Sequence, residues 1–139
     1  MGSYDNTPTV VVVLVPIRGG LLMIRRGVTD GHGELAMPGG YQMRGETWQE
    51  AGVREVLEET GVRIEADRLR LLTVVTTPDR RQNLLFGQTP PVEHEGSFVH
   101  DSEVLEVVVV DEPVRTAFPL HDEMVERFFR CRLTAETEH

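Results

Sequence analysis

The chain lacks lysine altogether, and arginine supplies all 14 basic side chains among its 139 residues. Without lysine, no side chain can form a Schiff base or act as an amine nucleophile. The formal net charge is −9, and no basic run interrupts that negative balance. Proteins that bind DNA or RNA independently of sequence need a basic surface for the phosphate backbone, so we expect no nucleic-acid partner. A small anionic substrate held by local arginines stays compatible with this composition.

Cysteine is nearly absent as well, since Cys131 is the only one. A single cysteine excludes an intramolecular disulfide, a redox pair and a cysteine-rich zinc site. We expect Cys131 to fill a minor packing position on a helix. The longest apolar runs, Val10–Val15 and Val107–Val110, are far shorter than the roughly 20 residues of a membrane helix. We also expect no signal peptide, no membrane partner and a cytoplasmic protein.

The length is enough for one domain with a real core, and the sequence shows no internal repeat. We therefore expect a single domain over residues 1–139, with residues 1–8 flexible. β-Branched apolar runs predict strands, and apolar residues at helical spacing predict a closing helix. The predicted strands are Thr9–Val15, Leu21–Arg26, Glu34–Met37, Leu69–Thr76, Asn83–Gln88 and Val104–Val110, and the closing helix is Asp122–Leu133. This order indicates an α/β domain layered as helix, mixed β-sheet and helix.

A further helix is predicted over residues 47–60. Thr47 and Glu50 have the spacing of a capping box at a helix start, and Gly61 is typical of a helix C-terminus. An apolar stripe recurs at i, i+3, i+4 and i+7 and is expected to face the core. Its members are Val53, Val56, Leu57 and Thr60.

Three carboxylates, Glu55, Glu58 and Glu59, share another face of this helix because they lie at i, i+3 and i+4. Like charges at this spacing destabilise a helix by roughly 0.2–0.5 kcal/mol per pair, and the C-terminal end of the dipole also disfavours anions. A bound cation would reverse both costs, whereas composition alone favours an ordinary solvated acidic helix. Upstream, Pro38-Gly39-Gly40 predicts a loop whose glycines take positive φ and expose backbone carbonyls to an ion or a phosphate ester.

Residues 40–62 read GYQMRGETWQEAGVREVLEETGV. Five residues separate the first Gly from a Glu, and seven more separate that Glu from an Arg-Glu pair. An apolar residue and any residue then lead to Glu-Glu, which is followed by any residue, Gly and a final apolar residue. This pattern resembles the Nudix box at every position, and average composition would produce it about once in a billion starting points. The fixed positions are Gly40, Glu46, Arg54, Glu55, Glu58, Glu59 and Gly61. Elsewhere in the chain the resemblance is one of pattern rather than identity.

The resemblance implies a hydrolase of nucleoside diphosphates linked to another moiety, in which a divalent metal directs water at phosphorus. It also implies the metal ligands: Glu55 and Glu59 as principal ligands, Glu58 as a further or water-mediated ligand, and the Gly39 carbonyl as a backbone ligand. Mg²⁺ prefers an octahedron of oxygen ligands and often shares it with substrate phosphates, so it suits a carboxylate cluster. Mn²⁺ is the alternative ion.

Arg54 lies four residues from both Glu50 and Glu58, so its planar fork could hold either carboxylate in a ligating orientation. Nudix hydrolases also often take a further carboxylate, beyond the box, as metal ligand or general base. A general base must lie within hydrogen-bond reach of the attacking water, which only coordinates can decide. The candidates are Glu93, Glu95, Asp101 and Glu103. We favour Glu103.

Substrate contacts are less clearly indicated. Arg25 and Arg26 end a predicted strand, where one of them could donate charge-assisted hydrogen bonds to a substrate phosphate, although a solubilising surface role is an equal alternative. Phe86 is our candidate for stacking on a nucleobase, although an aromatic residue in a strand is more often part of a core. Four histidines lack the spacing of a ligand set, and we expect them to be exposed to solvent. They are His32, His94, His100 and His121.

The substrate class stays open because it depends on the shapes of the loops at 27–33 and 77–103. Pro78 lies 16 residues beyond Val62, which resembles a proline near that place in ADP-ribose pyrophosphatases of the family. ADP-ribose or another nucleoside diphosphate sugar is therefore preferred. One alternative is a (d)NTP pyrophosphohydrolase of the sanitation type, and another is a non-catalytic nucleotide-sensing regulator. The resemblance also favours a homodimer, but a surface stripe cannot be told from a core stripe in sequence.

Overall fold

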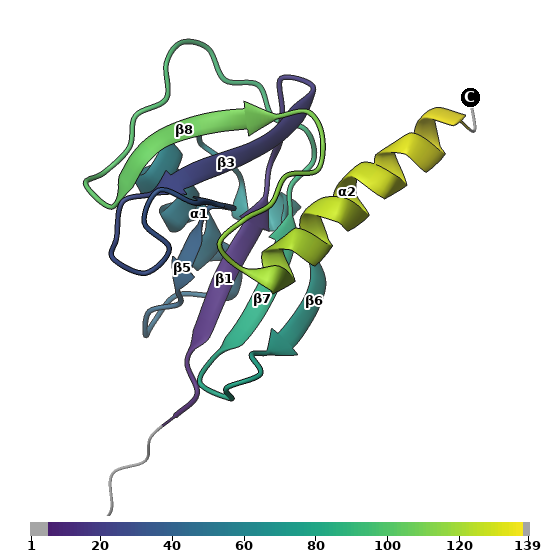
Figure 1. Cartoon of the computed structure of the whole chain (residues 1–139). Helices are drawn as coiled ribbons and strands as arrows, with labels where there is room; N and C mark the ends of the chain where they lie inside the picture. The colour runs from purple at the N-terminus through teal and green to yellow at the C-terminus, as the bar shows by residue number, and fades with distance from the viewer. Residues whose placement is uncertain (1–5, 138–139) are drawn as a thin grey trace, which may run out of the picture.

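The computed structural model describes residues 6–137 and contains two four-stranded sheets (Figure 1). The first sheet has the strand order β5 (Gly39–Tyr41), β1 (Thr9–Leu14), β7 (Asn83–Gln88) and β6 (Arg70–Thr76). It is mixed, because β1 pairs parallel with β7 while β5 and β6 pair antiparallel with their neighbours. A parallel partner for β1 far along the chain requires a long crossover, and that crossover carries the acidic helix.

The second sheet is built around β3 (Gly20–Arg26). It pairs antiparallel with β2 (Pro16–Ile17), β4 (Leu35–Ala36) and β8 (Val104–Val110). The turn from β2 into β3 uses positive φ angles at Arg18 and Gly19, of 50° and 76°. These two residues therefore make the tight turn of a hairpin.

Two α-helices lie on opposite sides of the first sheet (Figure 1). The acidic helix is α1 (Trp48–Thr60), and the closing helix is α2 (Pro119–Thr137), with a short 3₁₀ helix at Ala66–Arg68. The capping box at the start of α1 is confirmed: Glu50 N–H donates to Thr47 Oγ1 at 3.0 Å, and Thr47 N–H donates to Glu50 Oε1 at 2.8 Å. Gly61 ends the helix with a left-handed φ of 80°.

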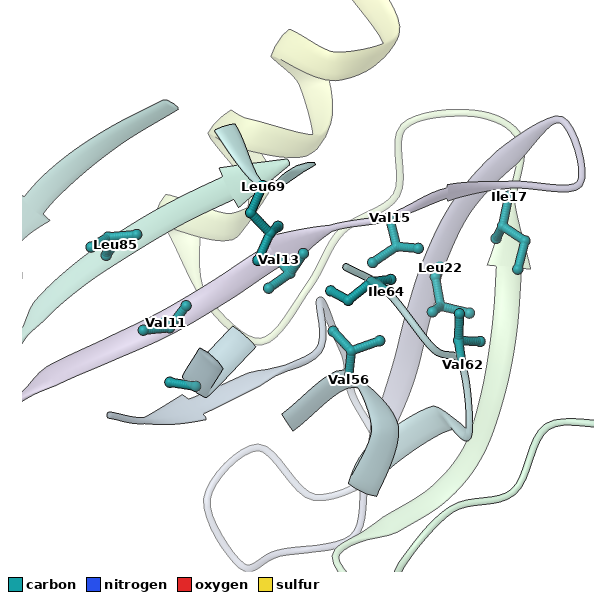
Figure 2. Close-up of a cluster of buried hydrophobic side chains, with 11 residues drawn as sticks. Val11, Val13, Val15, Ile17, Leu22, Val56, Val62, Ile64, Leu69 and Leu85 are labelled. Carbon is teal, nitrogen blue, oxygen red and sulfur yellow. The ribbon is translucent and has the colours of Figure 1, made fainter. Parts of the chain in front are cut away.

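The layers follow from the alternation of side chains along β1. Val11, Val13 and Val15 face α1 and join a core with Val56, Ile64 and Leu69 (Figure 2). On the other face, Val12 and Leu14 pack with Met124, Val125 and Phe129 of α2. The prediction of helix, mixed sheet and helix is therefore confirmed, and the strand is apolar throughout because both of its faces are buried.

The stripe predicted to bury α1 is wrong in part. Val56 and Thr60 are fully buried, and the half-buried Val53 packs against the same core, but Leu57 is only half-buried. The buried face also includes Ala51, Gly52 and Glu59. Gly52 packs so closely on β1 that an added Cβ would lie 3.0 Å from Val13. A glycine lets the helix approach the sheet, so the buried face turns toward the small residues.

Several boundaries differ from the predictions. Flexibility was expected as far as Pro8, yet its carbonyl accepts a hydrogen bond from Asn83 N–H at 3.0 Å; residues 1–5 lie outside the described residues. The closing helix begins earlier than predicted, at Pro119, because proline fits the first helical position. Cys131 is exposed rather than packed. In the described part of the chain, no helix has the length and hydrophobicity needed to cross a membrane.

Candidate functional site

The glycine pair forms strand β5 instead of the predicted loop. Gly39 and Gly40 are absent from the residues with positive φ, and they pair with Val12 and Val11 of β1. Glycine is needed here for close approach: a Cβ on Gly39 would collide with the Val11 carbonyl, and one on Gly40 would lie 2.5 and 2.6 Å from the carboxylate oxygens of Glu55. The expected left-handed conformation is therefore wrong.

The backbone of Gly39 faces α1. In an antiparallel ladder, alternate residues turn both their N–H and C=O away from the paired strand. The bonds from Val13 N–H to Pro38 and from Gln42 N–H to Thr9 set this alternation, and they leave Gly39 pointing outward. Its N–H donates to Glu59 Oε1 at 2.8 Å. The Gly39 carbonyl therefore opens on the same side as the box carboxylates.

Arg54 donates hydrogen bonds to several residues in and around the box. Its Nη2 and Nε donate to the two carboxylate oxygens of Glu46 at 2.7 and 3.1 Å, and Nη2 also donates to the Tyr41 carbonyl at 3.0 Å. Nη1 donates to Glu55 Oε1 at 2.8 Å and lies 3.4 Å from Glu58. Of the two expected partners, Glu58 is the one that Arg54 contacts, while Glu50 serves the helix cap instead.

The carboxylates of the box differ in environment. The guanidinium of Arg54 and the Met43 N–H lower the pKa of Glu46 to about 2. Burial raises the pKa of Glu55, although its bond to Arg54 opposes that rise. Glu58 is more open, with 47% of its side chain exposed. The three glutamates predicted as ligands thus range from a solvated position to a buried one.

Glu59 is the most constrained of these acids. Only 7% of it is exposed, and burial raises its pKa to about 8 despite the hydrogen bond from Gly39 N–H. The negative charges of Glu55, Asp101 and Glu103 raise this pKa further. A buried carboxylate among other carboxylates is held in its charged form only at a cost in free energy.

A loop beyond the box brings two more carboxylates to this place. The N–H groups of Val99 and Asp101 donate to the carbonyls of Thr60 and Glu58, at 3.1 and 3.2 Å, so the loop completes the C-terminal turn of α1. Glu103 follows, and its charge raises the pKa of both Glu55 and Glu59. Of the four candidates beyond the box, Asp101 and Glu103 therefore lie with the box acids. Neither Glu93 nor Glu95 is among the charges that raise the pKa of Glu55 or Glu59.

The donor set fits a hard divalent cation. It consists of carboxylate oxygens and a backbone carbonyl, which Mg²⁺ and Mn²⁺ prefer. Within residues 6–137, no three acidic, histidine or cysteine side chains lie close enough to hold an ion as they stand. Two of the candidate ligands are instead satisfied internally, Glu55 by Arg54 and Glu59 by Gly39. A cation would replace these contacts and relieve the repulsion that raises the pKa of Glu59.

A cavity of about 580 Å³ opens beside Glu59, Gly39 and Gly40. Its wall includes Arg26, whose guanidinium lies 4.8 Å from the centre of the Phe118 ring. Apolar side chains from β1, β3, β7 and α2 form much of the remaining surface. They are Val10, Val12, Ile24, Leu84 and Leu120.

Of the three residues predicted to contact substrate, only Arg26 lines this cavity. Arg25 pairs with Glu106 at 2.9 Å and donates to the Gly33 carbonyl, also at 2.9 Å. Phe86 is 1% exposed within the core, so a stacking role for it is wrong. The run Leu84-Leu85-Phe86 is the signal that marks a strand buried on both faces. Phe118, which sequence reasoning missed, offers its half-buried ring to the cavity instead.

The expectation that the four histidines are exposed is wrong for His121. It is 5% exposed and lines the cavity from the first turn of α2, whereas His32 and His100 are exposed. Burial, with a smaller contribution from the charge of Arg26, lowers the pKa of His121 to about 4. The signal was present, since His121 continues the stripe of Met124, Val125, Phe128 and Phe129 by one helical turn.

The α/β/α sandwich and the glutamate-rich helix packed on a glycine strand define a Nudix-type domain. The sequence matches the family model described as "NUDIX domain" over residues 5–136. The chain belongs to the Nudix family.

Two relatives are similar in sequence. Nudix hydrolase 3 of Caenorhabditis elegans is 31% identical over 136 residues, covering 90% of this chain and 53% of the relative. An ADP-ribose pyrophosphatase of Methanocaldococcus jannaschii is 43% identical over 60 residues, covering 43% of this chain and 34% of the relative. The chain thus spans about half, or less, of the length of these relatives.

Solved structures share the fold. A NUDIX hydrolase from Nitrosomonas europaea superposes with a TM-score of 0.83 at 23% identity, covering 95% of this chain and 75% of the other. A bifunctional NMN adenylyltransferase/ADP ribose pyrophosphatase from Francisella tularensis, complexed with AMP and a Mn ion, superposes with a TM-score of 0.68 at 21% identity. That match covers 99% of this chain and 43% of the other.

Proposed function

We propose that the protein hydrolyses a pyrophosphate bond in a small nucleoside diphosphate derivative, with ADP-ribose or a related nucleoside diphosphate sugar as preferred substrate. The observation that carries this proposal is the buried Glu59, held against the Gly39 backbone among Glu55, Asp101 and Glu103. A site that concentrates carboxylates, next to a cavity of nucleotide size, is suited to a cation and an anionic substrate.

The ion we propose is Mg²⁺, with Mn²⁺ as an alternative. Glu55, Glu58, Glu59 and the Gly39 carbonyl would hold it. When bound, it would neutralise diphosphate charge and help to orient the attacking water. The Mn ion in the Francisella tularensis structure supports this choice of ion.

The chain's own residues have distinct roles in this proposal. Arg54 fixes the orientation of Glu55 through the bond from its Nη1, and the pairing with Glu46 holds Arg54 itself in place. Glu103, exposed to solvent at the site, accepts the proton of the attacking water. Arg26 donates to an oxygen of the substrate at the cavity wall. Its stacked position over Phe118 restricts the guanidinium to that wall.

ADP-ribose is preferred because two of the similar proteins carry that activity in their names. The chain covers only part of both, so the substrate is a proposal for this chain. We further propose a cytoplasmic location, in keeping with the single free cysteine. The homodimer indicated by the family resemblance stays a prediction.

The test is a panel of nucleotides incubated with the full chain and Mg²⁺, with products separated by chromatography. ADP-ribose should yield AMP and ribose 5-phosphate, and a chelator should abolish this. Glu55→Gln should lose about 10²- to 10³-fold in rate, the range seen when a single electrostatic group is removed from a site, while the exposed Glu93→Gln should keep full activity. Release of pyrophosphate from nucleoside triphosphates alone would instead identify a sanitation enzyme. No turnover of any nucleotide would contradict enzymatic function.

A further inference from the structure

His121 is a buried titratable side chain that lines the cavity, and the proposed reaction does not use it. It lies at the start of α2, where its ring makes an edge contact with Phe86 at 5.7 Å and a tilted contact with Phe118 at 4.9 Å. Both distances join ring centres. The ring is thus fixed between a core aromatic residue and an aromatic residue of the cavity wall, and it cannot swing out to solvent.

The hydrogen bonds of this ring fix its tautomer. Met37 N–H is a buried donor, and it donates to His121 Nδ1 at 3.3 Å. A neutral imidazole has one donor and one acceptor nitrogen, so accepting at Nδ1 places the hydrogen on Nε2. Burial keeps the ring neutral at physiological pH, because it lowers the pKa of His121 to about 4. The Nε2–H is therefore a donor and never an acceptor.

That donor reaches the cavity. Through residues 6–137, no buried side-chain nitrogen or oxygen lacks a hydrogen-bond partner. The hydrogen bond found for the His121 side chain in this part of the chain is the one at Nδ1, so Nε2 is not sealed within the core. His121 lines the cavity of about 580 Å³, which leaves the cavity as the space that Nε2–H faces.

The surroundings indicate which group the donor would meet. The cavity wall includes the apolar side chains of Ile24, Leu84 and Leu120, together with the Phe118 ring that His121 contacts. The charged side chains of the same wall are Arg26, Asp30, Glu59 and Glu123. A neutral donor beside apolar and aromatic surface suits a neutral, planar group with acceptor atoms. An anionic group of the substrate is matched instead by the charge of Arg26 on the same wall.

We infer that His121, through Nε2–H, is a specificity-determining residue that donates to a ring nitrogen of the substrate's adenine base, beside Phe118. This inference rests on the proposed function, since it names the contact that selects the base. A site that buries a donor rejects ligands lacking the acceptor, because the donor would be left unpaired. Adenine offers three such acceptors, N1, N3 and N7.

Calorimetry with AMP and its 1-deaza, 3-deaza and 7-deaza analogues tests the inference, because each analogue removes one acceptor. One analogue should bind the unaltered protein about tenfold more weakly than AMP, the loss expected for one neutral hydrogen bond. His121→Asn keeps an acceptor for Met37 N–H but removes the Nε2 donor. It should bind AMP about tenfold more weakly and no longer distinguish that analogue from AMP.

His121→Phe separates the contact from the fold, because it removes both the donor and the acceptor for Met37 N–H. Its melting temperature should fall, while its AMP affinity should match that of His121→Asn. Unchanged AMP affinity in His121→Asn, a deaza deficit that persists in that variant, or no AMP binding at millimolar concentration would each overturn the inference. Binding that follows the expected pattern without hydrolysis of any nucleotide would contradict the proposed function alone.

Discussion

Arg54 donates from Nη2 and Nε to the two carboxylate oxygens of Glu46, at 2.7 and 3.1 Å. The pair joins the loop before α1 to the middle of the helix, and a third bond to the Tyr41 carbonyl ties in the end of β5. Two parallel hydrogen bonds fix direction as well as distance, which a lysine cannot reproduce. The orientation of Glu55 therefore depends, through Arg54, on Glu46, which lies before the helix begins.

Arg54→Lys should lower Mg²⁺ affinity and turnover by about 10- to 100-fold, the range typical of residues that orient metal ligands. The lysine keeps the charge but loses the fork, so Glu55 is no longer held by the same geometry. Metal titration by calorimetry, together with initial rates, measures the effect. The exposed Arg63→Lys is the matched control and should change neither quantity. Equal behaviour of both variants would contradict an orienting role for Arg54.

Glu59 should make the metal-free protein less stable as pH rises. Its pKa is about 8 in the folded chain and about 4.5 in the unfolded chain, so between these values the folded state binds more protons. The free energy of unfolding therefore falls from pH 4.5 to pH 8, by up to about 5 kcal/mol. Urea denaturation in a chelator across this range measures the slope.

Two comparisons isolate Glu59 in that experiment. Glu59→Gln removes the titration, so it should be more stable than the unaltered chain at pH 8 without metal and about equal at pH 4.5. Added Mg²⁺ should stabilise the unaltered chain at pH 8 far more than the variant. A Glu59→Gln variant that is less stable than the unaltered chain at pH 8 in chelator would contradict the prediction, because it would show that ionisation of Glu59 does not destabilise the folded state.

His121 should make the protein less stable as the pH falls below about 6.5. Its pKa is about 4 in the folded chain and about 6.5 in the unfolded chain, so between these values the unfolded state binds more protons. The free energy of unfolding therefore falls as pH drops from 6.5 to 4, by about 3 kcal/mol from this residue. The difference between the unaltered chain and His121→Asn should show this slope. His32→Asn, at an exposed position, should leave the slope unchanged.

Glu103 should be the carboxylate beyond the box that matters for turnover. Glu103→Gln should lower kcat by about 10²- to 10⁴-fold, the contribution of a general base, with little change in KM. Asp101→Asn provides a comparison, because Asp101 holds the Glu103 N–H at 3.0 Å and thus positions the loop. Its loss should affect kcat less. A larger fall in kcat for Asp101→Asn than for Glu103→Gln would transfer the base role to Asp101.

Local patterns in the sequence were sufficient for α1 and most of the strands. The capping box, the helix-ending Gly61 and the apolar run of β1 each act over one or two turns or one strand, so their physics is contained in neighbouring residues. The spacing of the box also placed Glu55, Glu58 and Glu59 on one face. That α1 packs on β5 required tertiary structure.

What the sequence could not supply depends on contacts between distant segments. Gly39 and Gly40 read as a flexible loop because nothing nearby reveals that β1 and Glu55 crowd them. Phe86 and Phe118 are equally aromatic in sequence, and only the sandwich decides that one is core and the other cavity wall. The same holds for Asp101 and Glu103, whose loop meets α1 through backbone bonds that carry no side-chain signature.

Val99 and Asp101 complete the last turn of α1 through their backbone amides, so the start of the segment that carries Asp101 and Glu103 is anchored to the helix. Residues 93–97 precede this junction and are largely exposed. Arg18 donates to the carbonyls of His94 and Gly96, so an insertion or deletion there would alter the surface around Arg18 while the hydrogen bonds that join 99–101 to the helix keep the acids in place.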